Sequence, residues 1–242
     1  MNASVKTYLS THSVFSTAEF TEMLRNSFPE IGRATVYNKL KALCDAGTIT
    51  RTSKGHFCVS EPKKYHYELS KTAKEISAFI SDNHPFVDFQ IWELYQMNEF
   101  VNHLFAHNTI FIEVEDMLDE SIFHLLFTKY PHVLLNPTID EYYKYAGDET
   151  IVVRKLITEA PPAFGSYKQA SLEKILVDLF GRGLAGNLIS KSEYRAIYED
   201  SFKKYNINLA KMYRYARRRN VERAIKDFIK NETELTPEYI ND

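Results

Sequence analysis

Apolar side chains in the first quarter of the chain recur at the three- and four-residue spacing of amphipathic helices. This spacing predicts three helices, with apolar faces made by Val5, Tyr8 and Leu9, by Phe20, Met23, Leu24 and Phe28, and by Val36, Leu40 and Leu43. We expect Ser16 or Thr17 to cap the second helix, and Ser16 with Glu19 three residues later is typical of a capping box. Pro29 and Gly32 separate the second helix from the third, and we expect Gly47 to end the third.

A β-hairpin is predicted directly after these helices. Residues 48–59 consist of two β-prone runs on either side of a polar turn that ends in Gly55. Helix, helix, turn, helix and hairpin is the order of a winged helix-turn-helix. We therefore predict a winged helix-turn-helix DNA-binding domain over residues 1–64.

The pattern changes from Tyr65 onward. After a helix at 70–81, we predict strands at 86–92, 109–115, 132–135 and 150–157, with helices at 119–130 and 140–145. Strands spaced by helices favour a small α/β sheet. A loop with two prolines and a glycine at 159–165 leads to helices at 171–180, 190–203, 208–219 and 221–230, the first capped by Ser171. We expect an α+β or α/β protein whose second domain, 65–242, ends in a helical region.

The net charge of −2 conceals an uneven distribution. Residues 1–64 carry a formal charge of +4, residues 65–200 carry −10, and residues 201–242 carry +4. Basic segments of this kind favour a polyanionic partner. An apolar content of 44% excludes a disordered chain. Because no apolar run is long enough for a membrane span or a secretory signal, we expect a cytoplasmic protein with no membrane partner.

The third helix carries the residue types that read DNA. With Val36, Leu40 and Leu43 facing inward, polar side chains remain outside, and Arg and Asn match the edges of guanine and adenine in the major groove. Lysines would contact phosphates, Tyr37 would serve either the core or a phosphate, and the hairpin tip would reach the backbone or the minor groove. The predicted DNA-binding residues are Arg33, Thr35, Tyr37, Asn38, Lys39, Lys41, Arg51, Lys54 and His56. A winged helix used only for protein docking is the alternative.

A second basic surface is predicted near the end of the chain. Its residues are Lys203, Lys204, Lys211, Arg214, Arg217, Arg218, Arg219 and Arg223. Two interpretations stay open, because the sequence does not position these helices. They form either a second nucleic-acid surface or a face that docks on the acidic middle domain or on a partner.

Three carboxylates raise the alternative of a divergent metal-dependent nuclease of the PD-(D/E)xK type. Asp88 lies on one predicted strand, and Glu113 and Glu115 share one face of the next. Such nucleases resemble this arrangement but carry a Lys where this chain has Glu115, and a carboxylate does not supply the positive charge that steadies the attacked phosphate. We therefore favour a solvated strand face and predict neither catalytic residues nor a metal site.

Further motifs indicate no cofactor. His103 and His107 would pair on a helix, but no third metal ligand follows at a motif spacing. Residues 181–186 match G-x-G-x-x-G, yet they follow a predicted helix, whereas the dinucleotide-binding fingerprint follows a strand. Cys44 and Cys58 have apolar neighbours and are expected to be buried structural thiols.

Two groups of residues carry a resemblance to a known family. Ala34-Thr35-Val36-Tyr37 with Leu40, Leu43 and Gly47 and Ile49, and then Leu172-Glu173-Lys174 with Val177-Asp178-Leu179, resemble the AbiEi family of antitoxins from type IV toxin–antitoxin and phage abortive-infection systems. The resemblance implies a non-enzymatic transcriptional autorepressor that binds double-stranded DNA at repeats in its own promoter. It also implies that the protein counteracts a nucleotidyltransferase toxin, without requiring direct contact with that toxin. The long acidic middle, with Glu113 and Glu115, departs from the family's motifs.

Overall fold

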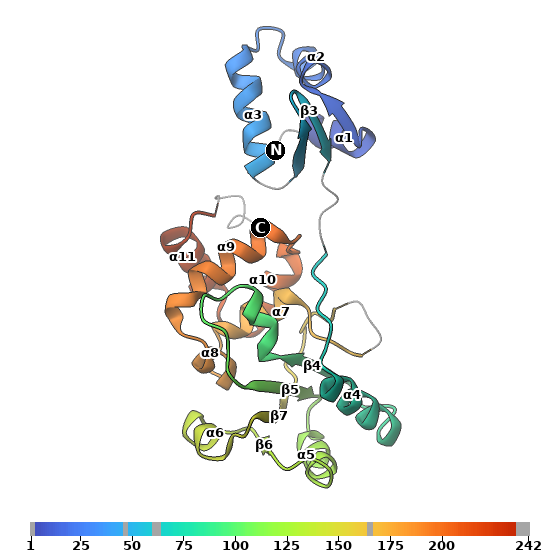
Figure 1. Cartoon of the computed structure of the whole chain (residues 1–242), viewed down its shortest axis with the longest axis vertical. Helices are drawn as coiled ribbons and strands as arrows, with labels where there is room; N and C mark the ends of the chain where they lie inside the picture. The colour runs from blue at the N-terminus through green and yellow to red at the C-terminus, as the bar shows by residue number, and fades with distance from the viewer. Residues whose placement is uncertain (1–2, 46–47, 60–63, 164–166, 236–242) are drawn as a thin grey trace. The chain divides into compact units, whose positions relative to one another are not determined.

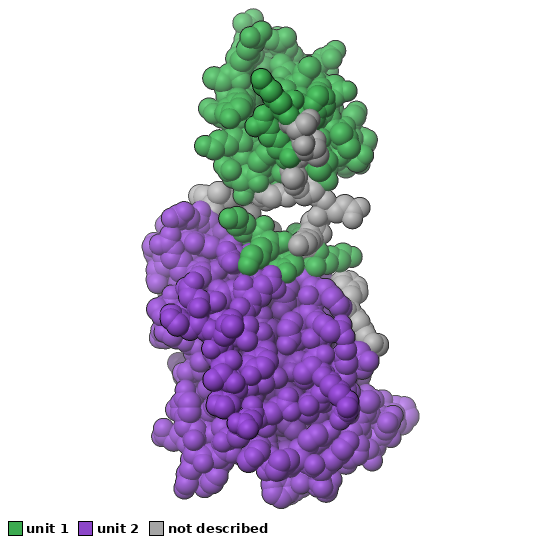
Figure 2. Space-filling model, viewed as in Figure 1, with its two compact units in different colours: residues 1–64, 203–206 green, residues 65–202, 207–242 purple. Residues whose placement is uncertain are grey.

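The computed structural model describes residues 3–45, 48–59, 64–163 and 167–235, and shows a mixed α+β protein with two small sheets (Figure 1). Its chain divides into two compact units, which Figure 2 distinguishes by colour. Unit 1 comprises residues 1–64 with 203–206, and unit 2 comprises residues 65–202 with 207–242. Gly47, the expected end of the third helix, lies outside the described residues.

Within its described residues, unit 1 contains three helices and a three-stranded antiparallel sheet. Its elements are α1 (Ala3–Thr11), β1 (Val14–Ser16), α2 (Thr17–Ser27), α3 (Arg33–Asp45), β2 (Ile49–Ser53) and β3 (His56–Val59), with the strands in the order β1-β3-β2. The expected capping box is present: the Glu19 amide donates to Oγ of Ser16, and the Ser16 amide donates to Oε2 of Glu19. Strand β1 is too short to give a pattern in the sequence, and it was not predicted.

The core of unit 1 forms where the predicted apolar faces meet. Ten side chains are buried there, namely Val5, Leu9, Phe15, Phe20, Leu24, Val36, Leu40, Leu43, Ile49 and Phe57. Phe15 of β1 joins this core by stacking on Phe20 and Phe57, with ring centroids 5.5 and 5.8 Å apart. Phe28, predicted as part of the inner face of the second helix, is instead 46% exposed because α2 ends one residue before it.

Unit 2 is built on a four-stranded mixed sheet. Its strands are β4 (Phe89–Glu93), β5 (Asn108–Val114), β6 (Val133–Leu135) and β7 (Glu149–Lys155), in the order β4-β5-β7-β6. β4 pairs antiparallel with β5, whereas β5, β7 and β6 run parallel. The first strand begins later than the predicted residue 86, and Phe86 is 97% exposed.

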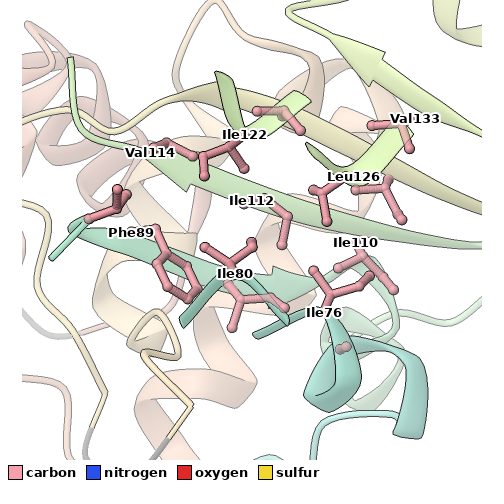
Figure 3. Packing of buried hydrophobic residues seen from close by; sticks show 14 of the residues in the cluster. Ile76, Ile80, Phe89, Ile110, Ile112, Val114, Ile122, Leu126 and Val133 are labelled. Atoms are coloured by element: carbon pink, nitrogen blue, oxygen red, sulfur yellow. The ribbon is translucent and has the colours of Figure 1, made fainter. Parts of the chain in front are cut away.

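Alternation along the strands gives this sheet two different faces. One face packs against α4 (Lys71–Asn83) and α5 (Asp119–Phe127), and Figure 3 shows Ile76 and Ile80 of α4 meeting this face of the sheet. The other face carries Trp92 and Glu113 and meets α7 (Leu172–Leu179). The expected cap is present, since Oγ of Ser171 accepts the amide of Lys174.

The remaining helices of unit 2 are mostly near the predicted positions. They are the 3₁₀ helix η1 (Leu94–Glu99), α6 (Ile139–Tyr145), α8 (Leu184–Leu188), the 3₁₀ helix η2 (Lys191–Glu193), α9 (Tyr194–Lys204), α10 (Leu209–Arg218) and α11 (Glu222–Glu232). The short elements η1 and α8 were not predicted, and η2 lies within the helix predicted at 190–203. Among the described residues, none of the helices is both long and apolar enough to cross a bilayer.

Candidate functional site: an exposed basic helix and a buried charge network

Helix α3 has one buried side and one polar side. Val36, Leu40 and Leu43 are buried at a spacing of four and three residues, which directs the intervening side chains outward. Arg33, Thr35, Tyr37, Asn38 and Lys41 are exposed, and Lys39 is half-buried. Tyr37 is 66% exposed, so of its two expected roles the one in the core is excluded.

Two hollows flank the first turns of α3. One, of about 820 Å³, is lined by residues of α2 together with Arg33, Val36 and Tyr37. The other, of about 580 Å³, is lined by the turn between α2 and α3 together with Thr35 and Lys39. The predicted contact residues therefore border concave surfaces on both sides of the helix.

The hairpin also carries its predicted basic residues on the surface. Arg51, Lys54 and His56 are all exposed. Gly55 has φ +79°, a left-handed conformation that glycine adopts without strain, and its carbonyl oxygen accepts the amide of Thr17 at 2.8 Å. The hairpin tip is thereby tied to the start of α2.

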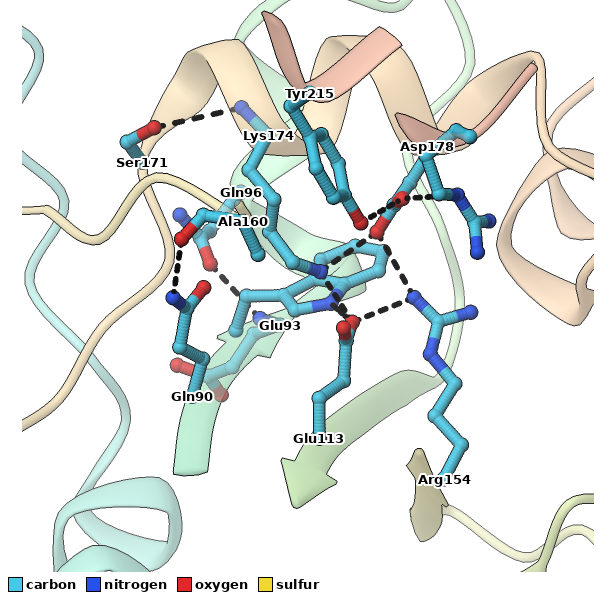
Figure 4. A network of polar contacts seen from close by, with 12 residues as sticks. Gln90, Glu93, Gln96, Glu113, Arg154, Ala160, Ser171, Lys174, Asp178 and Tyr215 are labelled. Atoms are coloured by element: carbon cyan, nitrogen blue, oxygen red, sulfur yellow. Dashed lines mark hydrogen bonds and ion pairs between the residues drawn. The ribbon is translucent and has the colours of Figure 1, made fainter. Parts of the chain in front are cut away.

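A network of buried charges lies between the sheet of unit 2 and α7 (Figure 4). Oε1 of Glu113 accepts hydrogen bonds from Nε1 of Trp92 at 2.9 Å and from Nη2 of Arg154 at 2.6 Å, and it also accepts from Nζ of Lys174. Glu113 is 1% exposed and Lys174 is fully buried. The predicted solvated strand face is therefore wrong for Glu113, because α7 covers it.

Asp178 is the second acid of this network. Its Oδ2 accepts from Arg154 at 3.0 Å and from Lys174 at 2.6 Å, and its Oδ1 accepts from the hydroxyl of Tyr215 at 2.9 Å. Nε of Arg219 lies 3.4 Å from the same Oδ1. Asp178 thus joins α7 to β7 through Arg154, and it joins α7 to the end of α10 through Tyr215 and Arg219.

These neighbours set the protonation states. Burial raises the pKa of the Glu113 carboxyl, but Arg154 and Lys174 outweigh that effect and lower the pKa to about 2. Burial lowers the pKa of Arg154, but Glu113 and Asp178 outweigh it and raise the pKa. Burial and the nearby Asp178 carboxylate raise the pKa of Tyr215. Glu113 is therefore ionised and Tyr215 is neutral at pH 7.

The three carboxylates of the nuclease alternative do not converge. Asp88 and Glu115 line an open cleft of about 570 Å³ at the end of the sheet, and Oε1 of Glu115 accepts the Asp88 amide at 2.8 Å. Glu113 is instead neutralised inside by two cations, which removes it as a metal ligand. Within the described ranges, no group of three His, Cys, Asp or Glu side chains is arranged to hold a metal ion.

Several residues of the second basic surface dock within unit 2. Nε of Arg214 lies 2.9 Å from Glu159, Nε of Arg218 donates to Oγ1 of Thr158 at 2.5 Å, and Arg219 approaches Asp178. Arg217 and Arg223 contact Glu222 and Asp227 of α11. Lys203 and Lys204 are exposed, and Lys211 is half-buried. Of the two open interpretations, the contacts of Arg214, Arg218 and Arg219 favour docking on the middle of the chain.

The remaining motifs lie apart from one another. His103 and His107 are not on a helix and contact Glu193 and Asp148 respectively, each at 3.4 Å. The glycine motif follows α7, as predicted. Cys44 and Cys58 are free and half-buried, so the expectation that both are buried was wrong.

The sequence did not predict that a buried charge network contains Arg154, Lys174, Asp178 and Tyr215. One signal pointed to it: Lys174 and Asp178 are four residues apart on a helix that is otherwise almost wholly apolar. Charges at that spacing within an apolar helix indicate a buried pair.

Comparison with known proteins gives one family. A family model described as a family of unknown function (DUF6577) matches residues 35–235. The matched range begins within α3 and includes every residue of the charge network. Among curated proteins, none matches the chain.

Proposed function

The chain belongs to this family of unknown function, DUF6577, and from that premise we propose that unit 1 is a winged helix-turn-helix that binds double-stranded DNA. The observation that carries the proposal is the polar side of α3. It exposes Arg33, Asn38 and Lys41, and residues 33–44 contain no acid. A helix with donors and positive charge on one side and core residues on the other suits the major groove.

The order of the elements supports this assignment. A short strand between α1 and α2, and an antiparallel hairpin after α3, form the sheet order β1-β3-β2. In a winged helix-turn-helix, the second helix of the motif enters the groove while the hairpin reaches the adjacent backbone. Here α3 would be that helix, and Lys54 would lie at the tip of the wing.

The exposed side chains divide into two kinds of contact. Arg33 and Asn38 would read base edges, since their planar groups form paired hydrogen bonds with guanine and adenine. Lys39, Lys41 and Tyr37 would hold phosphates, which supplies affinity without sequence preference. Arg51, Lys54 and His56 would add backbone or minor-groove contacts from the hairpin.

We further propose that the protein is a cytoplasmic, non-enzymatic autorepressor of the antitoxin type. It would bind repeats in its own promoter and counteract a nucleotidyltransferase toxin. The support is the resemblance to AbiEi antitoxins, whose second group of residues falls on α7. Lys174 and Asp178 of that group form buried ion pairs, so in this chain they stabilise unit 2.

A gel shift with the DNA upstream of the gene tests DNA binding. We expect specific retention in the presence of unrelated competitor DNA, with affinity falling steeply as salt rises. Arg33→Ala and Lys41→Ala should each weaken binding, whereas Lys6→Ala, which removes an exposed charge from α1, should leave it nearly unchanged. Equal affinity of all four proteins at one salt concentration would exclude α3 as the contact surface.

Growth assays test the antitoxin role separately. Expression of the protein should relieve the growth arrest caused by a nucleotidyltransferase encoded beside its gene. Full relief by the Arg33→Ala variant would show that neutralisation does not require DNA binding. Persistent arrest in the presence of the folded protein would contradict the antitoxin proposal and leave the DNA-binding proposal intact.

A further inference from the structure

Counted over the described residues, the buried network of unit 2 carries more positive than negative charge. Its acids are Glu113 and Asp178, and its cations are Arg154, Lys174 and Arg219. Lys174 is fully buried, and the side chains of Arg154 and Arg219 are only 14% and 17% exposed. A cation with little exposure and no counter-ion of its own is costly, so an anion bound beside these arginines would be stabilised.

Arg219 is the cation whose bonding is incomplete. Its Nε atom is buried and makes no hydrogen bond in the described parts of the chain. Its nearest acid, Asp178, is 3.4 Å away and already accepts from the hydroxyl of Tyr215 through the same oxygen. Nε of Arg219 therefore has an ion-pair neighbour but no hydrogen-bond acceptor, so this guanidinium is not fully satisfied by the described residues.

The position of Arg219 follows from the end of α10. The Val221 amide bonds back to the carbonyl of Ala216 at 3.0 Å, and Asn220 has φ +57°. This is a left-handed helix end, and asparagine is among the residues that tolerate it. Arg219 is the residue at which α10 ends, and its side chain lies beside Asp178 and Gly181.

Two guanidinium groups converge on the glycine motif that follows α7. A Cβ atom at Gly181 would overlap Nη2 of Arg219, and a Cβ atom at Gly183 would lie 3.2 Å from Nη1 of Arg154. The absent side chains thus leave room for both groups beside one short loop. Arg182, between the glycines, is exposed and adds a third positive charge.

We propose that this loop and the guanidinium groups of Arg219 and Arg154 form a binding site for a phosphate-type oxyanion. Guanidinium groups bind such anions through paired, charge-assisted hydrogen bonds, and one anion would neutralise the surplus of the network. Because both arginines are largely buried, only a small part of a ligand, about the size of one phosphate, would reach them. Free inorganic phosphate and the phosphoryl group of a mononucleotide share this chemistry. This site lies within unit 2 and goes beyond the DNA binding proposed for unit 1.

Trp92 provides a reporter for this site. It is the only tryptophan of the chain, its ring stacks on Phe111 with centroids 4.1 Å apart, and its Nε1 donates to Glu113. Cζ of Arg154 lies 6.0 Å from the centroid of its ring. An anion drawn against Arg154 should therefore change the fluorescence of Trp92.

The test is a titration of the full chain with potassium phosphate, at an ionic strength held constant with potassium chloride. We expect a saturable change in Trp92 fluorescence and a rise in Tm of several degrees at saturation. Arg219→Gln should weaken binding at least tenfold, and Arg219→Lys, which keeps the charge but loses the fork, should also weaken it. The matched control is Arg195→Gln, because Arg195 is half-exposed on α9 and paired with Glu199, and it should bind as the unmutated protein does.

A second variant keeps the test decisive if Arg219→Gln does not fold. Gly181→Ala leaves every charge in place but displaces the end of Arg219, so it should also weaken binding. Titration with adenosine monophosphate identifies the source: tighter binding than phosphate assigns a nucleotide, and weaker binding assigns the free anion. A linear, non-saturating response of the unmutated protein would overturn the site. Folded Arg219 and Gly181 variants that bind phosphate as tightly as the unmutated protein would also overturn it.

Discussion

Lys174 and Asp178 lie one helical turn apart on α7, and the Nζ atom of Lys174 is 2.6 Å from Oδ2 of Asp178. On an exposed helix such a pair would contribute a few tenths of a kcal/mol. Here both side chains are buried, and each also reaches a residue of the sheet, Glu113 or Arg154. The pair therefore joins α7 to the two central strands.

Removing Asp178 should destabilise unit 2 strongly. Asp178→Ala leaves the buried Lys174 with one acid in place of two and deprives Tyr215 of its acceptor. Breaking a buried ion pair from one side costs about 3–5 kcal/mol. Urea unfolding, followed by circular dichroism, measures this loss. Asp227→Ala removes an exposed acid paired with Arg223 on α11 and should change the free energy of unfolding by less than about 0.5 kcal/mol.

Glu113 should make stability depend on pH in the acid range. Its pKa is about 2 in the folded protein, against an ordinary value of 4.5. A lowered pKa gives stability that is fully present above pH 4.5 and is lost as the pH falls toward 2, on the order of 3 kcal/mol in all. The difference in unfolding free energy between the unmutated protein and Glu113→Gln, measured from pH 6 to pH 2.5, should shrink over that range. A constant difference would mean that the carboxylate charge is not what Glu113 contributes.

The salt dependence of DNA binding should distinguish phosphate contacts from base contacts. Lys41→Ala should lower the slope of log affinity against log salt by about 1 and weaken binding to every sequence alike. Asn38→Ala should keep that slope and reduce the preference for the specific site by about 1–3 kcal/mol. Fluorescence anisotropy with specific and unrelated duplexes at four salt concentrations measures both quantities. Identical changes in the two variants would place Asn38 on a phosphate.

The capping box of α2 should stabilise unit 1. Ser16→Ala removes the acceptor of the Glu19 amide and should cost about 1 kcal/mol. Thermal unfolding of the full chain, followed in the transition that contains unit 1, measures the loss. Ser27→Ala, at the exposed last residue of the same helix, should fall within about 0.5 kcal/mol of the unmutated protein.

Buried and exposed apolar side chains of unit 2 should differ strongly in their contribution to stability. Ile76→Ala removes a fully buried side chain of α4 and should cost about 2–5 kcal/mol. Phe86→Ala deletes a larger side chain that is 97% exposed and should have almost no effect. Urea unfolding of the two variants measures both losses. A large loss for Phe86→Ala would contradict the exposed position of this side chain.

The sequence predicts local features of this protein well and distant ones poorly. The buried side of α3 and the caps at Ser16 and Ser171 follow from spacing and residue type alone, since each depends on neighbours within one helical turn. The partners of Glu113 do not follow, because Arg154 and Lys174 are 41 and 61 residues away along the chain. Strand alternation places Glu113 on the face opposite Ile112, but it does not reveal which helix covers that face.

The span of these contacts also determines when they can form. Trp92, Glu113, Arg154, Lys174 and Tyr215 belong to five elements, and β5 and β7 pair in parallel only after the segment with α5, β6 and α6 has closed between them. Non-local pairings of this kind form slowly, because loop closure precedes the contacts that reward it. The charge network would then assemble after the folding barrier, so its mutations should accelerate unfolding and leave the folding rate nearly unchanged.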